Sequence, residues 1–353
     1  MLLCGTDSLG FKACSQCYAS TLDCDSLDSL VLTRPDNEFW WCECQNGSST
    51  DEVSCFHFSS SDQAETVIAV LPYGLPNRHR AVLADIPVDA ALVFHGAAHA
   101  QETLADLTPT DHLIIVASSR VLTASHKRLN CRISLMLQEP VAIKSRFYKF
   151  SSLFAKTYHR VLTHNTASLL KHANARFAAH GGAFVSFTES EGSPPKEKRI
   201  SLVASAKKTT IGHKLRHRIA AWSRDASPDL HLFGRGYQNL ENKREAHDAY
   251  RFSVCIENSR SSGYFTEKLI DSFLCHCLPV YWGAPDIAHF FDPRGMVSCN
   301  SEDELKHSIQ CLSEADYQRR LPYLIENRRR ALEYADLYAN AVRVLEFEKD
   351  VEG

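Results

Sequence analysis

Several features are absent from this sequence, and each absence excludes a class of protein. No apolar run reaches the roughly 18 residues that a membrane-spanning helix needs, and the apolar start at residues 1–5 is too short for a signal peptide. There is no phosphate-binding GxxxxGK(S/T) loop and no GxSxG nucleophile elbow. The pattern therefore excludes a helical membrane protein, a P-loop nucleotidase and a serine hydrolase with such an elbow.

A strong charge of one sign is also absent. The chain has 39 Lys and Arg against 42 Asp and Glu, which gives a net charge of −3 with neutral His. No bulk basic field exists to attract nucleic acid, so nucleic acid is not an expected partner, and membrane association is not evident. An anionic ligand would have to be held by a few individual cations.

The length and composition are those of an ordinary globular protein of about two domains. The chain has 353 residues, of which 44% are hydrophobic and 23% are charged. A length near twice the roughly 150 residues of a typical domain predicts two separate cores. As written, the chain is expected to be soluble or cytoplasmic.

Cysteine is abundant, with 13 residues, and seven of them lie in the first 55 positions. Cys14 and Cys17 have the spacing of half a zinc site, but Cys42 and Cys44 are one residue too close to complete it. A disulfide framework is disfavoured without a secretion signal. We therefore interpret these cysteines as scattered small hydrophobes in a poorly defined part, residues 1–64.

The rest of the sequence predicts an α/β protein with buried parallel strands. Short apolar runs, rich in Val, Ile and Leu, alternate with stretches that can form helices, and the first three runs end in Pro, Gly or Ser. These runs are at 66–71, 91–94, 113–116, 133–137, 200–204, 230–234, 252–256 and 279–283.

A polar, proline-containing stretch at 189–198 divides these strands into two groups. We expect one Rossmann-like domain at 65–190 and a second at 195–315, with one long helix in 316–353 that crosses back over the first domain. Two such domains face each other across a cleft at their strand edges. A helix at about 301–312 should begin at a capping box formed by Ser301 and Glu304.

The segment from Tyr250 to Asp286 contains the highest density of residues that could take part in binding or catalysis. Its first strand leads into Glu257-Asn258, and a helix opens with Thr266-Glu267-Lys268. The amino end of a helix attracts anions, and a lysine in the first turn opposes the helix dipole unless an anion compensates it. Lys268 therefore suggests a phosphate site, and Glu267 could accept hydrogen bonds from sugar hydroxyls. The alternative is that Glu267 only caps the helix while Lys268 points to solvent.

This segment resembles the donor-binding region of the α-1,3-fucosyltransferases, glycosyltransferase family 10. The resemblance rests on Ile256-Glu257-Asn258-Ser259, Tyr264-Phe265-Thr266-Glu267-Lys268 and Pro279-Val280-Tyr281-Trp282-Gly283, in that order and spacing. It is strong over 200–293, fair over 132–187 and not recognisable before about residue 66. It implies the GT-B fold class, with two facing Rossmann-like domains.

The resemblance implies roles for residues of the second domain. It assigns Glu267 to the fucose ring, Lys268 to the donor diphosphate, and Asn258 and Tyr264 to the nucleotide-sugar pocket. Upstream, Ser205 matches a serine of the family, whereas the alanine that follows it replaces the family's asparagine.

An arginine of the family holds the diphosphate from the helix after the first strand of this domain. Arg216 is the best match, but its distance in sequence from Ser205 is longer than usual. Lys214 and Arg218 therefore remain alternatives. A fixed cation stabilises the charge that a diphosphate leaving group develops, without a metal ion.

Inverting transfer also needs a carboxylate that takes the proton from the acceptor hydroxyl, on the opposite side of the sugar from the diphosphate. Glu139 follows the strand at 133–137 and precedes a proline, and it resembles the family's glutamate at this place. Ligands of open α/β sheets bind at such strand ends. The alternative is a glutamate exposed in a turn.

Together these features predict an inverting fucosyltransferase that moves L-fucose from GDP-fucose to a hydroxyl of an oligosaccharide or glycoconjugate acceptor, α-1,3/4-fucosyltransferase-like. The catalytic residues are Glu139 and Glu267, with no metal site and no required cofactor, although a divalent cation could stimulate turnover. A Golgi location is expected only if an anchor is missing from the chain. Two alternatives stay open: transfer from another nucleotide sugar, and a non-catalytic nucleotide- or glycan-binding relative.

Overall fold

The computed structural model describes residues 30–33, 39–44, 53–58, 66–72, 83–88, 91–95, 103–118, 129–188, 190 and 192–352. The chain forms two units, Met1–Ala64 and Glu65–Gly353. In the first unit, β1 (Leu30–Thr33), β2 (Phe39–Cys44) and β3 (Val53–Phe58) form an antiparallel sheet in the order β1-β2-β3. The expectation for Cys14 and Cys17 lies outside the described residues.

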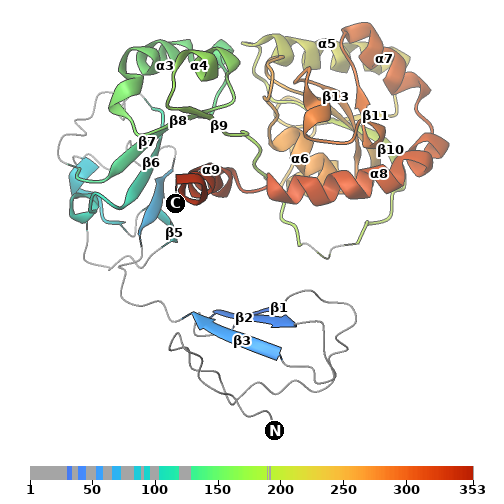
Figure 1. Cartoon of the computed structure of the whole chain (residues 1–353). Coiled ribbons are helices and arrows are strands. Elements are labelled where there is room, and N and C mark those ends of the chain that lie inside the picture. The colour runs from blue at the N-terminus through green and yellow to red at the C-terminus, as the bar shows by residue number, and fades with distance from the viewer. Residues whose placement is uncertain are drawn as a thin grey trace. The chain divides into compact units, whose positions relative to one another are not determined.

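The second unit begins with a six-stranded sheet of order β5-β4-β6-β7-β8-β9, which we call the N-half (Figure 1). Its parallel strands are β4 (Ile68–Leu71), β6 (His112–Val116), β7 (Arg132–Leu137), β8 (Val161–Thr163) and β9 (Ala175–Phe177). The edge strand β5 (Leu92–His95) pairs antiparallel with β4, so the parallel orientation expected for this run is wrong.

Helices cover both faces of the N-half sheet. On one face α3 (Val141–Phe154) and α4 (Thr166–Lys171) pack through a core that includes Phe147, Leu113 and Leu135. On the other face α9 (Leu337–Glu352) packs through Val342 and Leu345 (Figure 1). The C-terminal segment therefore returns to the N-half, as expected.

A five-stranded parallel sheet, the C-half, follows in the order β11-β10-β12-β13-β14. Its strands are β10 (Lys198–Val203), β11 (Leu230–Phe233), β12 (Tyr250–Ile256), β13 (Leu278–Trp282) and β14 (Val297–Ser298). Figure 1 shows α5 (Ile211–Ala226) and α7 (Glu302–Cys311) on one face, with α6 (Glu267–Leu274) and α8 (Glu314–Glu333) on the other.

The order in which the chain adds strands to the C-half sheet reverses at the centre of the sheet. From β10 the chain passes to β11 on one side and then returns to β12 on the other side. The loops after β10 and β12 therefore diverge at their carboxyl ends, which is where ligands of open α/β sheets bind. The predicted fold class, α/β with two Rossmann-like halves, is confirmed.

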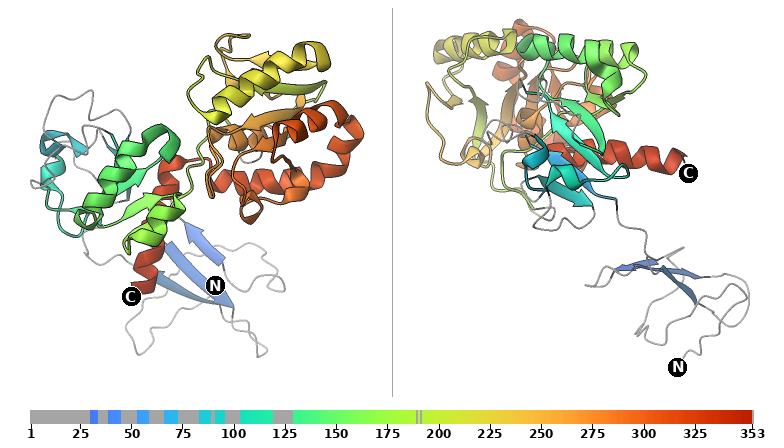
Figure 2. Two further views of the ribbon diagram at one scale, coloured as in Figure 1. Left: turned by 90° about the horizontal axis from the view of Figure 1, so that it is seen from above. Right: turned by 90° about the vertical axis from the view of Figure 1, so that its left-hand side faces the viewer.

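Ser301 caps α7 as predicted, because its Oγ accepts the Glu304 N–H at 3.1 Å. The full capping box is wrong, since the Glu304 carboxylate accepts the Asn300 N–H at 2.8 Å rather than that of Ser301. The single long C-terminal helix is wrong, since α8 ends at Glu333 and α9 begins at Leu337. The Tyr334 carbonyl between them accepts the Gly182 N–H at 2.8 Å and the Asn340 side chain at 3.2 Å. These bonds replace helical ones and turn the chain toward the N-half (Figure 2).

The connection between the halves passes close to this break. Gly181 has a φ of +50°, and its N–H donates to the Phe265 carbonyl at 3.1 Å. A Cβ atom at Gly181 would lie 2.4 Å from the Tyr334 carbonyl oxygen. The linker can therefore pass between α6 and the end of α8 only with glycine at this position. Within the described residues, no helix has the length and apolar character needed to cross a bilayer.

Replacing Gly181 with alanine should lower the free energy of unfolding by about 2 kcal/mol, because the left-handed backbone and the contact with Tyr334 both penalise a side chain. Gly192→Ala is the matched control, since nothing lies within 4 Å of a Cβ there. Chemical denaturation of both variants measures the difference. Equal stabilities would contradict the packing described for the linker.

Candidate functional site

A cleft of about 900 Å³ lies between the two halves of the second unit. The N-half contributes the end of β7, and the C-half contributes the ends of β10 and β12 with the amino ends of α5 and α6. All seven residues singled out from the sequence line this cleft: Glu139, Ser205, Arg216, Asn258, Tyr264, Glu267 and Lys268.

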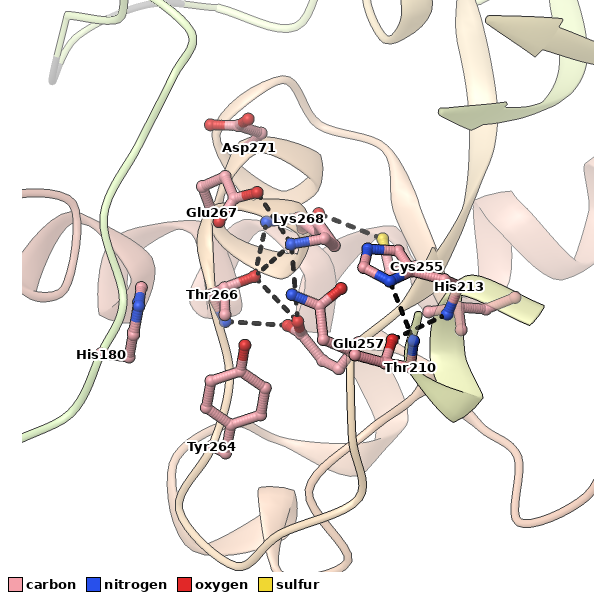
Figure 3. Close-up of polar contacts among 12 residues, drawn as sticks. His180, Thr210, His213, Cys255, Glu257, Tyr264, Thr266, Glu267, Lys268 and Asp271 are labelled. Carbon is pink, nitrogen blue, oxygen red and sulfur yellow. Dashed lines mark hydrogen bonds and ion pairs between the residues drawn. The ribbon is translucent and has the colours of Figure 1, made fainter. Parts of the chain in front are cut away.

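The first element that shapes the cleft is a buried carboxylate at the end of β12. Glu257 has no exposed surface. Its side chain accepts the Thr266 N–H and the Thr266 hydroxyl, both at 2.8 Å (Figure 3). Burial raises the pKa of Glu257, and Lys268 opposes that rise. Glu257 thus fixes the first turn of α6 against the strand.

Lys268 lies between two carboxylates. Its Nζ is 2.8 Å from Glu267 Oε1 and 3.8 Å from Glu257 Oε2, and it donates to Thr266 Oγ1 at 3.0 Å (Figure 3). Burial would lower the pKa of Lys268, but the two carboxylates outweigh burial and raise the pKa above its ordinary value. The lysine is therefore charged, and it points into the cleft rather than to solvent.

Glu267 is ionised for a related reason. Burial alone would raise its pKa, but Lys268 and then Lys243 outweigh burial and hold the pKa at about 2. The side chain also lies at the cleft wall. At neutral pH it presents a fixed negative charge that can accept hydrogen bonds.

The geometry distinguishes Arg216 from its neighbours on α5. Arg216 is buried, and it donates to the Ile256 carbonyl at 3.0 Å and to Asn258 Oδ1 at 2.6 Å. Lys214 and Arg218 are exposed on the other side of the helix, where Arg218 pairs with Glu302 at 2.7 Å. Of these three cations, only Arg216 lines the cleft.

The start of α5 lies unusually close to the end of β12. A Cβ atom at Gly212 would be 1.7 Å from the Glu257 carbonyl oxygen, so only glycine fits. His213, one residue further along, also lines the cleft. Burial and then the charge of Arg216 lower the pKa of His213 to about 4, so its imidazole is neutral at pH 7. The positive charge here comes from Arg216 and lysines.

Tyr264 brings the two halves into contact. It is buried, and its ring lies 4.9 Å from the ring of His164 at the end of β8 and 5.8 Å from the ring of His180. Its hydroxyl is hydrogen-bonded with Asn258. Burial, followed by the nearby carboxylates including Glu139, raises the pKa of Tyr264 well above its ordinary value, so the phenol is neutral.

The remaining two predicted residues complete the cleft from opposite sides. Ser205 follows β10 and is half-buried, while the alanine after it is exposed. Glu139 follows β7 as expected, and its backbone carbonyl accepts the Tyr148 hydroxyl at 2.9 Å. This bond ties the turn after β7 to the second turn of α3 and leaves the Glu139 carboxylate at the cleft wall.

Comparison with known proteins finds relatives of the C-half. Residues 194–324 match the family model of glycosyltransferase family 10 (fucosyltransferase), C-terminal part. The matched residues include the C-half strands β10 to β14 with α5 to α7, and they supply Arg216, Glu267 and Lys268 to the cleft.

A curated relative of this chain is the α-(1,3)-fucosyltransferase FucT of Helicobacter pylori, 36% identical over 112 residues. The match covers 31% of this chain and 21% of the bacterial enzyme, so the chain spans about a fifth of that relative's length.

Two solved structures match the chain in part. A crystal structure of an α1,3-fucosyltransferase with GDP is 17% identical, with a TM-score of 0.45, over 76% of this chain and 84% of that chain. The crystal structure of TarM is 10% identical, with a TM-score of 0.47, over 90% of this chain and 67% of that chain.

Sequence reasoning missed several charged residues of the site, including Glu257 and Lys243. The resemblance includes Glu257 but assigns it no role, although its position directly after a buried strand is a signal for a carboxylate with internal partners. Lys243 lines the cleft and pairs with the fully buried Asp271 of α6 at 2.8 Å. No local pattern identifies Lys243, because the ion pair joins segments 28 residues apart. Among the described residues, no group of His, Cys, Asp and Glu could hold a metal ion.

The depressed pKa of Glu267 predicts a specific pH dependence of stability. The unfolded-state pKa is near the ordinary 4.5 and the folded-state pKa is about 2, so this carboxylate stabilises the fold above pH 4.5 and loses that effect as the pH falls toward 2. The contribution at pH 7 should be about 3 kcal/mol. Glu267→Gln should therefore be less stable than the wild type by up to this amount.

The check is chemical denaturation of the wild type and Glu267→Gln between pH 7 and pH 3.5. The difference should be nearly constant down to about pH 5 and should shrink by roughly 40% at pH 3.5. Glu197→Gln, at an exposed position outside the cleft, serves as the control. A difference that stays constant over the whole range would contradict the pairing of Glu267 with Lys268.

Proposed function

We propose that this protein is an inverting fucosyltransferase that transfers L-fucose from GDP-fucose to a hydroxyl of a saccharide acceptor. The observation that carries the proposal is that all seven residues assigned from the family resemblance line one cleft. They come from three strand ends and two helices of both halves. The match of residues 194–324 to the family 10 model supports the donor class.

The proposed reaction is a single displacement at the anomeric carbon of fucose. Glu139 takes the proton of the acceptor hydroxyl, the acceptor oxygen bonds to the anomeric carbon, and the bond to the diphosphate oxygen breaks, which releases GDP. Glu139 lies on the N-half, whereas Arg216 and Lys268 lie on the C-half. The base and the leaving-group cations thus occupy opposite walls, as inversion requires.

The charges of the cleft suit a diphosphate leaving group. Arg216 and Lys268 are both fixed by bonds to other groups, so they need little reorganisation when negative charge develops on the diphosphate. Glu267 carries a negative charge beside Lys268, which suits hydrogen bonds to the sugar and stabilisation of positive charge on its ring. We propose that no metal is required, with any effect of a divalent cation limited to stimulation.

The test of the proposal is a GDP- and UDP-release assay over a panel of nucleotide sugars, followed by transfer from the accepted donor to a glycan array. GDP-fucose should be the preferred donor, with turnover retained in EDTA. Turnover with another donor and none with GDP-fucose would assign a different sugar. Nucleotide binding without turnover on any acceptor would favour a non-catalytic relative.

Glu139→Gln should lower kcat by about 10²- to 10⁴-fold, because the amide cannot accept the proton. GDP-fucose should still raise the melting temperature of this variant, since the diphosphate and sugar contacts remain. Glu197→Gln should keep the wild-type kcat. A Glu139→Gln variant with nearly unchanged kcat would remove Glu139 from the role of base.

Arg216→Lys should lower kcat/KM by about 100-fold, because a lysine cannot make the two directed bonds of the guanidinium while it supports the diphosphate. Arg218→Lys, two residues along the same helix but facing solvent, should change kcat/KM by less than about twofold. Initial rates at varied GDP-fucose give both values. The reverse ranking would transfer the role to Arg218.

A further inference from the structure

The cationic side chains of this chain are strongly segregated along the sequence. From residue 140 to residue 188 there are seven Lys and Arg and not one Asp or Glu, although the whole chain has a net charge of −3. This segment contains α3, α4, β8 and β9 of the N-half. The net charge of the whole chain, from which no bulk basic field was expected, does not report this local excess of cations.

The same segment exposes large apolar side chains at the carboxyl ends of its helices. Leu153 and Phe154 at the end of α3 are 80% and 45% exposed, and Leu170 at the end of α4 is 85% exposed. The two helix ends are neighbours, because Lys171 Nζ donates to Ser152 Oγ. Figures 1 and 2 show α3 and α4 together on the outer side of the N-half sheet.

Exposed lysines surround these apolar residues. Lys149, Lys156 and Lys171 are exposed, and none of the three pairs with a carboxylate among the described residues. We call Leu153, Phe154, Leu170, Lys149, Lys156 and Lys171 the basic apolar patch.

The patch is remote from the cleft. The helix α3 begins two residues after Glu139, and Leu153 lies 12 residues further along, which corresponds to about 18 Å of helix. Likewise α4 starts near the cleft edge of the sheet and ends at Lys171. Substitutions in the patch therefore leave the residues of the cleft in place.

We propose that the basic apolar patch docks the protein on an anionic lipid surface. Leu153 and Leu170 enter the headgroup layer, and the lysines contact lipid phosphates. Aliphatic side chains among lysines suit a bilayer interface, which offers both apolar burial and negative charge. A nucleic acid offers only the charge, and it would leave the leucines in water. This inference does not depend on the proposed fucosyl transfer.

The experiment is co-sedimentation of the full chain with vesicles of phosphatidylcholine alone or with 30% phosphatidylglycerol, at low and high salt. Binding should require the anionic lipid and should weaken at high salt. Lys149→Glu/Lys156→Glu should lower the partition coefficient by about tenfold or more, and Leu153→Ser/Leu170→Ser by a similar factor.

The matched controls make the same kinds of substitution at exposed positions of the C-half. Arg224→Glu/Arg235→Glu alters the charge by the same amount at exposed positions, and Ile325→Ser removes an exposed apolar side chain of α8. Both should bind vesicles as the wild type does. All variants should keep wild-type melting temperatures, since the substituted residues are exposed.

Three results would overturn the proposal. The first is vesicle binding that the patch variants leave unchanged. The second is loss of binding in the lysine variant with no effect in the leucine variant, which would indicate a purely electrostatic contact in which the leucines do not enter the lipid. The third is sedimentation without vesicles that the leucine variant abolishes, which would indicate that the patch contacts a second copy of this chain.

Discussion

The geometry of the cleft depends on one buried carboxylate. An ionisable group without access to water must be satisfied by internal partners, and Glu257 finds them in the backbone and hydroxyl of Thr266 and in the charge of Lys268. The loop after β12 must therefore fold back, so that the first turn of α6 lies against the end of β12. Space around Glu257 is correspondingly small, and a Cβ atom at Gly283 would lie 2.8 Å from its Cγ.

This arrangement places Lys268 between two carboxylates. Its Nζ lies 2.8 Å from Glu267 and 3.8 Å from Glu257, and both carboxylates raise the pKa of the lysine although it is buried. Arg216 is positioned differently, through a carbonyl and an amide oxygen rather than a carboxylate. Its positive charge is therefore not cancelled by a direct ion pair, and it remains available to an anion in the cleft.

Much of the fold and the site could be predicted, because local patterns determine strand ends. Apolar runs identified β7, β10, β12 and β13, and polar residues directly after a run, such as Glu139, had to reach the sheet edge. The choice of Arg216 over Lys214 and Arg218 depends on which side of α5 faces the sheet. Spacing in the sequence alone does not determine that side.

The features that could not be predicted depend on contacts between distant segments. The apolar periodicity continues from α8 into α9, so nothing local indicated the break at Tyr334, which Gly182 and Asn340 determine from outside. The pairing of Lys243 with Asp271 is equally remote. Whole-chain charge was misleading for another reason: a sum cannot report how cations are distributed along the chain.

The contacts that position α6 also position the two halves relative to each other. Asp271 of α6 accepts the N–H groups of Phe184 and Val185 in the linker, at 2.7 and 3.2 Å. The helix that carries Glu267 and Lys268 is thus bonded directly to the segment that leads back to the N-half. Since the N-half carries Glu139, the distance between the proposed base and the proposed leaving-group cations depends on this linkage.

Catalysis by displacement is sensitive to such distances, because a reacting pair held about 1 Å too far apart loses much of its rate. Two chain crossings, at Gly181 and at Tyr334, lie side by side and share hydrogen bonds. Small changes there act on both halves at once, whereas changes at the outer ends of α3 and α4 do not. For the proposed transfer, we therefore expect the rate to depend also on buried residues that no substrate touches, such as those where the chain passes between the halves.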